Sequence, residues 1–288
     1  MRSAEPAGAG ANAPRWDITL PSRRRPVRLP GVVMAGFSDR ANELHDIALV
    51  PHPAVMLLFD LGDEPFVVED GRGAQQRERV VAGLAPHRAR GRGLARSSEC
   101  LQVRLSPIVA HAVLGASADL GGTTATLDDL WGREAVRVHE RLRAAPTWEE
   151  RFAIARAVLA RRDGTGRAVD PEVAFCWRRM VAGRGRVRVE RLAAETGWSR
   201  KRLWSRFCSQ VGLTPKRAAR LIRFDHAAHR LAAGHGTASV AAECGYTDQS
   251  HLHRDTMTFA GMTPAAVAVA PFLALDDVAW PAGHGAGT

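Results

Sequence analysis

The chain has 288 residues, of which 45% are hydrophobic and 24% are charged. This composition is typical of a globular protein, and it excludes a wholly disordered chain, a collagen-like rod and a disulfide-rich scaffold. The four cysteines lie far apart and form no CxxC pair. Neither a signal peptide nor an apolar run of membrane-spanning length is evident. We therefore expect a cytoplasmic protein with neither disulfides nor a cysteine-bound zinc ion.

The formal net charge of +10 is concentrated in one part of the chain. Residues 176–264 contain 16 basic and 6 acidic side chains, which accounts for the whole excess. A basic stretch beside a neutral remainder indicates that one domain alone has a polyanionic partner.

The N-terminal half has the pattern of a β domain. Residues 1–14 are mainly small residues with Pro and Gly, and they predict a disordered leader. An N-terminal domain is expected over residues 15–163. From Trp16 to about Leu105, short apolar runs such as 31–36 and 54–59 are separated by Gly, Pro and Asp. This pattern predicts an antiparallel β sandwich or barrel. With the helices expected further along, the chain as a whole is predicted to be an α+β protein of two domains.

Two amphipathic helices are predicted at the end of this domain. Apolar residues recur at helical spacing over residues 129–144, and Thr147 forms a capping box with Glu150 at the start of a second helix. Together they predict an αα-hairpin at about residues 128–162. Its apolar faces either pack against the β domain or form a dimer interface.

Residues 164–169 predict a linker, and residues 170–270 contain an internal repeat. Ala193, Ala194, Glu195, Gly197 and Arg206 recur 48 residues later. Each copy, at about residues 189–212 and 237–261, combines a short helix, a glycine suited to a left-handed turn, a capping residue and a second helix. This is the pattern of a helix-turn-helix unit, in which the second helix enters the major groove.

The caps and the connection between the copies are also visible in the sequence. Ser199 is the cap of the first copy, and Thr247 or Asp248 that of the second. Thr214–Pro215 begins a long connecting helix that would hold the two units at a fixed separation. Residues 271–288 are predicted to be a tail.

Over residues 173–267 the sequence resembles the DNA-binding domain of the AraC/XylS-type family of bacterial transcription regulators. The positions that carry this resemblance are Ser199, Leu203, Phe207, Gly212, Thr214, Pro215, Arg223, Ala227, Ala241, Gly245, Tyr246, Asp248, Ser250, Leu252, Arg254, Gly261, Thr263 and Pro264. The resemblance implies transcription control, with a cupin-like N-terminal domain that senses an effector, dimerises or does both. The chain departs from the family at Thr256–Met257, where Phe–Lys is usual, and at Ser205, where arginine is usual.

The resemblance and the chemistry of groove recognition together predict the DNA contacts. The predicted base contacts are Arg200, Lys201, Trp204 and Ser205 in the first unit and Gln249, Ser250, His253 and Arg254 in the second. The predicted phosphate contacts are Lys216, Arg217, Arg220 and Arg223 in the connecting helix. Its arginines could equally form salt bridges, and Arg223 could pair with Asp225 or Glu243.

The N-terminal half contains no set of residues that predicts catalysis, and nucleophile-elbow, Walker and GxGxxG motifs are absent. Glu43, His45, His52 and His87 lack the close HxH spacing of a metal-binding cupin. We therefore predict neither an enzyme nor a metal or other cofactor. The alternative is a cupin-like enzyme or metal-binding protein with a nonspecific basic appendage for nucleic acid.

The favoured function is a sequence-specific transcription regulator modulated by its N-terminal domain. Its expected partners are operator DNA, in double-stranded form, and a second copy of the chain. RNA polymerase and an unidentified small-molecule effector are further candidates, and no membrane is expected. Two repeated units at constant spacing favour the regulator over a nonspecific appendage.

Overall fold

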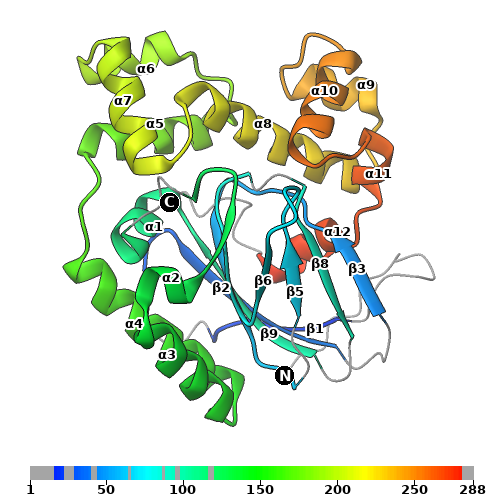
Figure 1. Cartoon of the computed structure of the whole chain (residues 1–288). Helices are drawn as coiled ribbons and strands as arrows, with labels where there is room; N and C mark the ends of the chain where they lie inside the picture. The colour runs from blue at the N-terminus through cyan, green and yellow to red at the C-terminus, as the bar shows by residue number, and fades with distance from the viewer. Residues whose placement is uncertain are drawn as a thin grey trace.

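The computed structural model describes residues 16–22, 29–39, 44–63, 66–85, 88–94, 98–115 and 120–280. The predicted leader lies outside these residues. A β part is followed by a helical part, which confirms the predicted fold class (Figure 1). Within the described part of the chain, no helix is both long and apolar enough to cross a bilayer.

The N-terminal domain is built on two antiparallel sheets. The larger sheet has the order β1 (Trp16–Thr19), β2 (Val32–Asp39), β9 (Ser98–Leu105), β4 (Val55–Asp60), β7 (Arg79–Ala82) and β10 (Thr124–Thr126). The smaller sheet has the order β3 (Leu44–Ala48), β8 (Arg90–Leu94), β5 (Val67–Glu69) and β6 (Gln75–Arg77). The longest register pairs β2 with β9, from Val32 opposite Leu105 to Asp39 opposite Ser98.

Strand β4 shows why this domain has short, nearly continuous apolar runs. Leu57 and Phe59 face a core that also includes buried residues of the following helices, whereas Leu58 packs with Val68 and Val80. Successive side chains of a strand point to opposite faces. Because both faces of β4 are covered, apolar residues replace the usual alternation.

The predicted helical hairpin is present and lies against the larger sheet. The helices of this region are α1 (Pro107–Leu114), α2 (Leu127–Trp131), α3 (Arg133–Ala144) and α4 (Trp148–Thr165). Thr147 caps α4, because its hydroxyl accepts a hydrogen bond from the Glu150 amide at 3.3 Å. Leu142 and Phe152 are fully buried in the same core as Leu57. The apolar faces of the hairpin therefore pack against the β domain.

The C-terminal domain is helical. Its helices are α5 (Pro171–Ala182), α6 (Val189–Thr196), α7 (Arg200–Val211), α8 (Pro215–Ala232), α9 (Thr237–Glu243), α10 (Gln249–Phe259) and α11 (Pro264–Ala268). Helices α5–α7 lie at one end of α8 and α9–α11 at the other, with the β sheets below (Figure 1). Phe224 of α8 stacks on Phe259 of α10, with ring centroids 5.3 Å apart. Helix α8 is thus the shared core element of both units.

The prediction of a tail over residues 271–288 needs correction. Residues Pro271–Ala279 form a further helix, α12, with proline in its first turn. Trp280 is 3% exposed and its ring lies 6.4 Å from that of Phe37 in β2. Burial of Leu273 and Trp280 stabilises this segment against the β domain, below α8. Residues 281–288 lie outside the described part.

Candidate nucleic-acid interface

The first helix-turn-helix unit consists of α6 and α7. Gly197 ends α6 in the left-handed region, with φ at +68°. Ser199 then caps α7, since its hydroxyl accepts a hydrogen bond from the Arg202 amide at 3.2 Å. Leu203 and Phe207 are both fully buried. These contacts fix one face of α7 in the core and leave its opposite face in solvent.

The second unit, α9 and α10, repeats this geometry. Gly245 has φ at +75°, and Tyr246 behind it is buried. Of the two candidate caps, Asp248 is the one that binds: its carboxylate accepts a hydrogen bond from the His251 amide at 2.7 Å. Leu252 is fully buried. The repeat in the sequence is therefore a repeat in structure.

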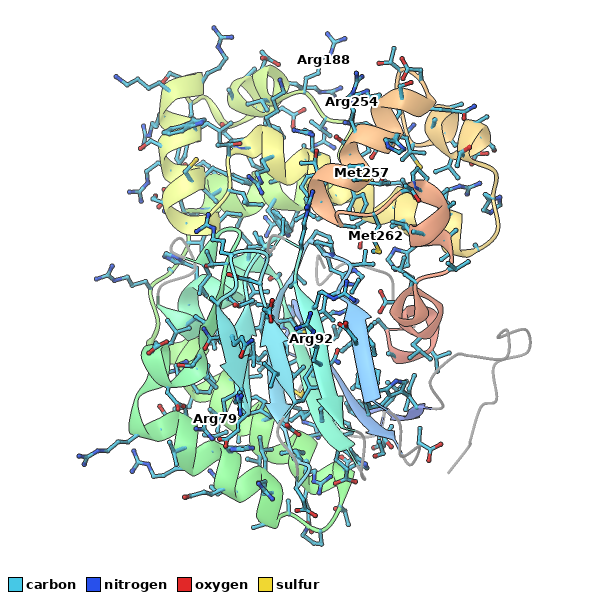
Figure 2. All side chains as sticks on the ribbon, turned by 45° about the vertical axis from the view of Figure 1, so that its right-hand side comes forward. Arg79, Arg92, Arg188, Arg254, Met257 and Met262 are labelled. Carbon is cyan, nitrogen blue, oxygen red and sulfur yellow. The ribbon has the colours of Figure 1, made fainter. Side chains whose placement is uncertain are left out.

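The predicted base contacts lie on the solvent faces of the two second helices. All of them are exposed: Arg200, Lys201, Trp204, Ser205, Gln249, Ser250, His253 and Arg254. Trp204 is 55% exposed, and an exposed tryptophan is an unusual use of a large apolar side chain unless it contacts a partner. Arg254 lies at the edge of the domain that is remote from the β sheets (Figure 2).

The arginine beside Ser205 has a structural role. Arg206 forms a bidentate ion pair with Asp170 at the start of α5, with distances of 2.6 and 2.7 Å. Bidentate pairing fixes the direction of a guanidinium group. Arg206 therefore holds α7 against α5, and its guanidinium is not available to replace the arginine that is usual at position 205.

The four predicted phosphate contacts fall into two pairs. Lys216 and Arg217 are exposed in the first turn of α8. By contrast, Arg220 and Arg223 both bind Asp255 of α10, at 2.6 and 3.2 Å. Of the alternatives left open for Arg223, the structure shows an ion pair, but its partner is Asp255 rather than Asp225 or Glu243. Glu243 binds Arg230 instead.

The departure at Thr256–Met257 is accommodated within α10. Thr256 is fully buried, and its hydroxyl donates a hydrogen bond to the backbone carbonyl of His253 at 2.9 Å. This local bond satisfies a polar atom that would otherwise be costly to bury. Met257 is half-buried and stands on the side of α10 toward the β domain, unlike Arg254 (Figure 2).

A second constellation joins the two domains, and the sequence analysis did not find it. Five buried or nearly buried residues make up this interdomain cluster: His52, Arg104, Asp225, His229 and Asp276. His52 precedes β4, Arg104 is in β9, Asp225 and His229 are in α8, and Asp276 is in α12. Hydrogen-bonded members of this cluster are separated by up to 173 positions in the sequence. No local sequence pattern therefore reveals the cluster.

The carboxylate of Asp276 is the centre of the interdomain cluster. Arg104 donates to its Oδ1 at 2.8 Å, and the Nε2 atoms of His52 and His229 lie 3.1 and 3.0 Å from its Oδ2. Burial and the nearby Arg104 lower the pKa of His52. Against the opposing effect of burial, His52 and Arg104 hold the pKa of Asp276 well below its usual range.

Of the four metal-binding residues considered from the sequence, only the side chain of His52 lies within the described part of the chain. His52 joins His229 and Asp276, neither of which belongs to the N-terminal half. Glu43, His87 and the side chain of His45 lie outside the described residues.

An apolar pocket adjoins the interdomain cluster. It is lined mainly by residues of the larger sheet and by α12, and its lining includes Phe37, Met56, Leu58, Phe66 and Leu275. His52, Arg104 and Asp276 form its polar end. The pocket and the cluster therefore share three residues.

Comparison with known proteins addresses the identity of the helical domain. Residues 192–268 match the family model of a helix-turn-helix domain, which is of the AraC type. No protein of curated function matches the chain by sequence.

Several solved structures share part of the architecture. ToxT from Vibrio cholerae O395 has a TM-score of 0.47 and 10% identity, covering 84% of this chain and 98% of ToxT. ToxT from strain SCE256, bound to an unsaturated fatty acid, has a TM-score of 0.45 and 11% identity, covering 83% and 95%. The AraC-like transcriptional activator CuxR has a TM-score of 0.33 and 14% identity, covering 72% and 86%.

The assignment rests on the sequence of the helical domain and on its two capped units. The family match begins within α6 and includes α7, α8, α9, α10 and α11 in full. The chain contains, over residues 192–268, a helix-turn-helix domain of the AraC/XylS type, the type of domain with which transcription regulators bind DNA.

Proposed function

We propose that this protein is a sequence-specific regulator that reads two adjacent major-groove segments with α7 and α10. The observation that carries the proposal is the attachment of both units to opposite ends of α8, each with its predicted base contacts exposed (Figure 1). Adjacent major-groove segments on one face of B-DNA lie about 34 Å apart. A single helix that joins both units suits simultaneous reading of two such segments.

The ion pairs between α8 and α10 support this geometry. Asp255 is 1% exposed and receives both Arg220 and Arg223. These bonds would limit rotation of the second unit about α8. Lys216 and Arg217 would contact phosphates beside the first unit, where the N-terminus of α8 adds backbone N–H groups.

We further propose that the N-terminal domain modulates DNA binding and that the protein acts as a homodimer. Modulation is supported by three residues, His52, Arg104 and Asp276, which line the apolar pocket and also belong to the interdomain cluster. A small apolar effector that moved any of them would alter the contacts that hold α8 to the β domain.

The proposed specificity is tested by selection from a random pool of double-stranded DNA. We expect a motif with two half-sites about one helical turn apart. A salt titration of the selected DNA and of scrambled DNA then separates phosphate contacts from base recognition. Equal binding of both DNAs without any motif would overturn the proposal and favour an enzyme or metal-binding protein with a nonspecific appendage.

Substitution of Arg254 tests the role of α10 in base recognition. Replacing Arg254 with Ala should cost about 1–3 kcal/mol of binding free energy at one base position and relax the preference there. Replacing Arg217 with Ala should instead weaken binding to all sequences and reduce the salt dependence by about one unit of slope. Equilibrium binding to single-base variants of the selected site distinguishes the two. A uniform loss for the Arg254 variant would assign it to the phosphates.

A further inference from the structure

The two histidines of the interdomain cluster have both ring nitrogens close to oxygen atoms. In His52, Nδ1 lies 2.8 Å from Asp225 Oδ1 and Nε2 lies 3.1 Å from Asp276 Oδ2. In His229, Nδ1 lies 2.8 Å from the backbone oxygen of Asp225 and Nε2 lies 3.0 Å from the same Asp276 Oδ2. A neutral imidazole has only one N–H group, so each neutral ring would direct one lone pair at an oxygen. Either a proton or a metal ion at the Nε2 atoms would turn this repulsion into attraction.

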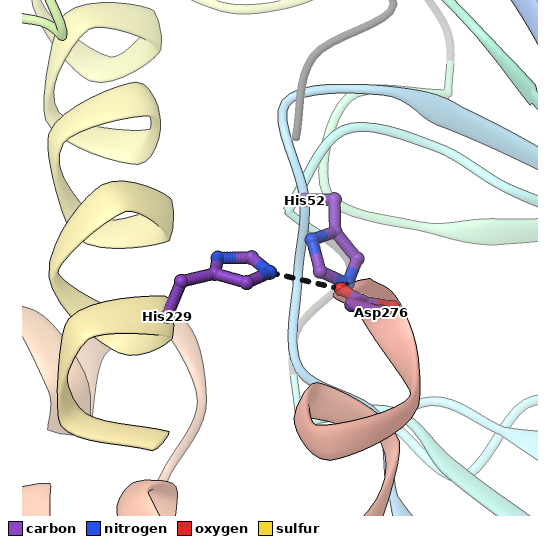
Figure 3. A group of neighbouring side chains, drawn as sticks. All are labelled: His52, His229 and Asp276. Atoms are coloured by element: carbon purple, nitrogen blue, oxygen red, sulfur yellow. Dashed lines mark hydrogen bonds and ion pairs between the residues drawn. The ribbon is translucent and has the colours of Figure 1, made fainter. Parts of the chain in front are cut away.

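The orientation of the rings matches that of metal-binding histidines. Both Nδ1 atoms face groups that accept hydrogen bonds, the carboxylate and the backbone carbonyl of Asp225. When Nδ1 donates to such a partner, the lone pair is on Nε2, the arrangement found around protein-bound metals. Both Nε2 atoms converge on one carboxylate oxygen, which the rings approach from different sides (Figure 3).

The distances between these three atoms also suit a common ion. Zinc bonds to histidine nitrogen and carboxylate oxygen are about 2.0–2.2 Å long, so ligand atoms of a tetrahedral site are roughly 3.3 Å apart. The two nitrogens lie 3.1 and 3.0 Å from Asp276 Oδ2, and all three atoms fall within 4.8 Å of one another. A small adjustment of the side chains would accommodate the ion.

The charge of the cluster favours a cation as well. When both rings are neutral, as metal ligation requires, the carboxylates of Asp225 and Asp276 outweigh the single guanidinium of Arg104 by one negative charge, which a bound cation offsets. His52, Asp225 and Asp276 have side chains that are 7%, 6% and 4% exposed, so water compensates this charge poorly. Arg104 binds Asp276 mainly through Oδ1, at 2.8 Å, and its second nitrogen lies 3.4 Å from Oδ2, which the two rings approach more closely.

We propose that His52 Nε2, His229 Nε2 and Asp276 Oδ2 bind one divalent transition-metal ion of the zinc class. Two imidazoles and one carboxylate suit such an ion better than Mg²⁺ or Ca²⁺, which prefer oxygen ligands. Three protein ligands leave the fourth position for a water molecule. Because the ligands come from the segment before β4, from α8 and from α12, the ion fastens the DNA-binding domain to the β domain.

Metal binding by the full chain is the direct test. The purified protein is stripped with a chelator, dialysed and titrated with Co²⁺, whose visible absorption reports its ligands, and then with Zn²⁺ in competition. We expect one equivalent of Co²⁺ in a nitrogen and oxygen environment, displaced by Zn²⁺, and a higher Tm for the loaded protein. No saturable binding, or a thiolate charge-transfer band, would overturn the proposal.

Variants locate the ion without depending on DNA binding. Asp276→Asn and His229→Gln each remove a ligand while keeping hydrogen-bonding capacity, and both should abolish binding or weaken it by more than 100-fold. Asp225→Asn changes the partner of His52 Nδ1 and removes a charge 3.8 Å from His229 Nδ1, and it should weaken binding by about 10–100-fold. His235→Gln, at an exposed position, is the matched control and should bind like the wild type. Unchanged affinity in both ligand variants would overturn the assignment.

Discussion

Asp255 is fully buried in α10, and Arg220 and Arg223 of α8 both donate to its carboxylate. The guanidinium of Arg223 also lies 4.4 Å from the ring centroid of Tyr246. A buried carboxylate is stable only when its oxygens are satisfied. One acidic residue, Asp255, therefore holds the second unit against α8. From the sequence alone, Arg220 and Arg223 could equally have been phosphate contacts.

Replacing Asp255 with Asn tests this structural role. The variant keeps the side-chain volume but loses the charged acceptor, and it should lower the free energy of unfolding by about 2–3 kcal/mol. Urea denaturation measures the change, with Asp163→Asn at an exposed position of α4 as the control. A loss no larger than that of the control would show that the two arginines do not depend on Asp255.

His139 gives the β domain a definite dependence on pH. Its Nδ1 lies 2.8 Å from Arg79 Nη1, a donor, and its Nε2 binds the backbone oxygen of Asp60. Nδ1 must therefore accept, which only the neutral ring can do. Burial lowers the pKa of His139, and the charge of Arg79 adds to this effect.

The direction of the pH effect follows from that lowered pKa. The unfolded chain binds a proton near pH 6.5, whereas the folded chain binds it only at lower pH. The contribution of neutral His139 to the stability of the folded chain is therefore complete above pH 6.5. It decreases as the pH falls from there toward the pKa of His139 in the folded chain. Unfolding free energies of His139→Gln should change less with pH over this interval than those of the wild type. Parallel curves would contradict the assignment.

At the scale of elements, the two helix-turn-helix units depend on short capping signals. Ser199 and Asp248 each accept a hydrogen bond from the amide three positions later, and Thr214 and Thr263 do the same for α8 and α11. Such caps satisfy amides that have no partner within the helix. The starts of α7, α8 and α10 could therefore be predicted from the sequence, because the cause is local.

Replacing Asp248 with Ala should destabilise the start of α10 by about 1 kcal/mol. Asp248→Asn retains an acceptor at the same position and should restore most of the loss. Thermal unfolding of the two variants beside the wild type measures the difference. Equal losses in both would mean that the negative charge at the helix N-terminus, rather than the hydrogen bond, provides the stabilisation.

At the scale of the whole molecule, the two domains are in direct contact through their backbones. Gly121, which precedes β10, lies so close to Gly212 at the end of α7 that a β-carbon on Gly121 would collide with the Gly212 carbonyl oxygen. Helix α1 of the β domain also packs against α7. Helix α7 is thus held in place by the N-terminal domain as well as by α8.

Replacing Gly121 with Ala should loosen this contact. The added methyl group meets backbone rather than a movable side chain, so the domains must separate locally. We expect faster hydrogen exchange in α1 and α7, with little change in α3. Gly164→Ala in α4, where a β-carbon meets nothing within 4 Å, is the control. Unchanged exchange in α7 would show that the Gly121 contact does not hold the two domains together.

The sequence by itself determined the helix-turn-helix units of this protein, because glycine turns, caps and helical spacing act over a few residues. It also determined the β character of the N-terminal half. The tertiary structure decided the rest: α12 in place of a tail, the attachment of Arg220 and Arg223 to Asp255, and the interdomain cluster. These features join residues far apart in the chain, such as His52 and Asp225, whose proximity depends on how the two domains pack and leaves no local pattern in the sequence.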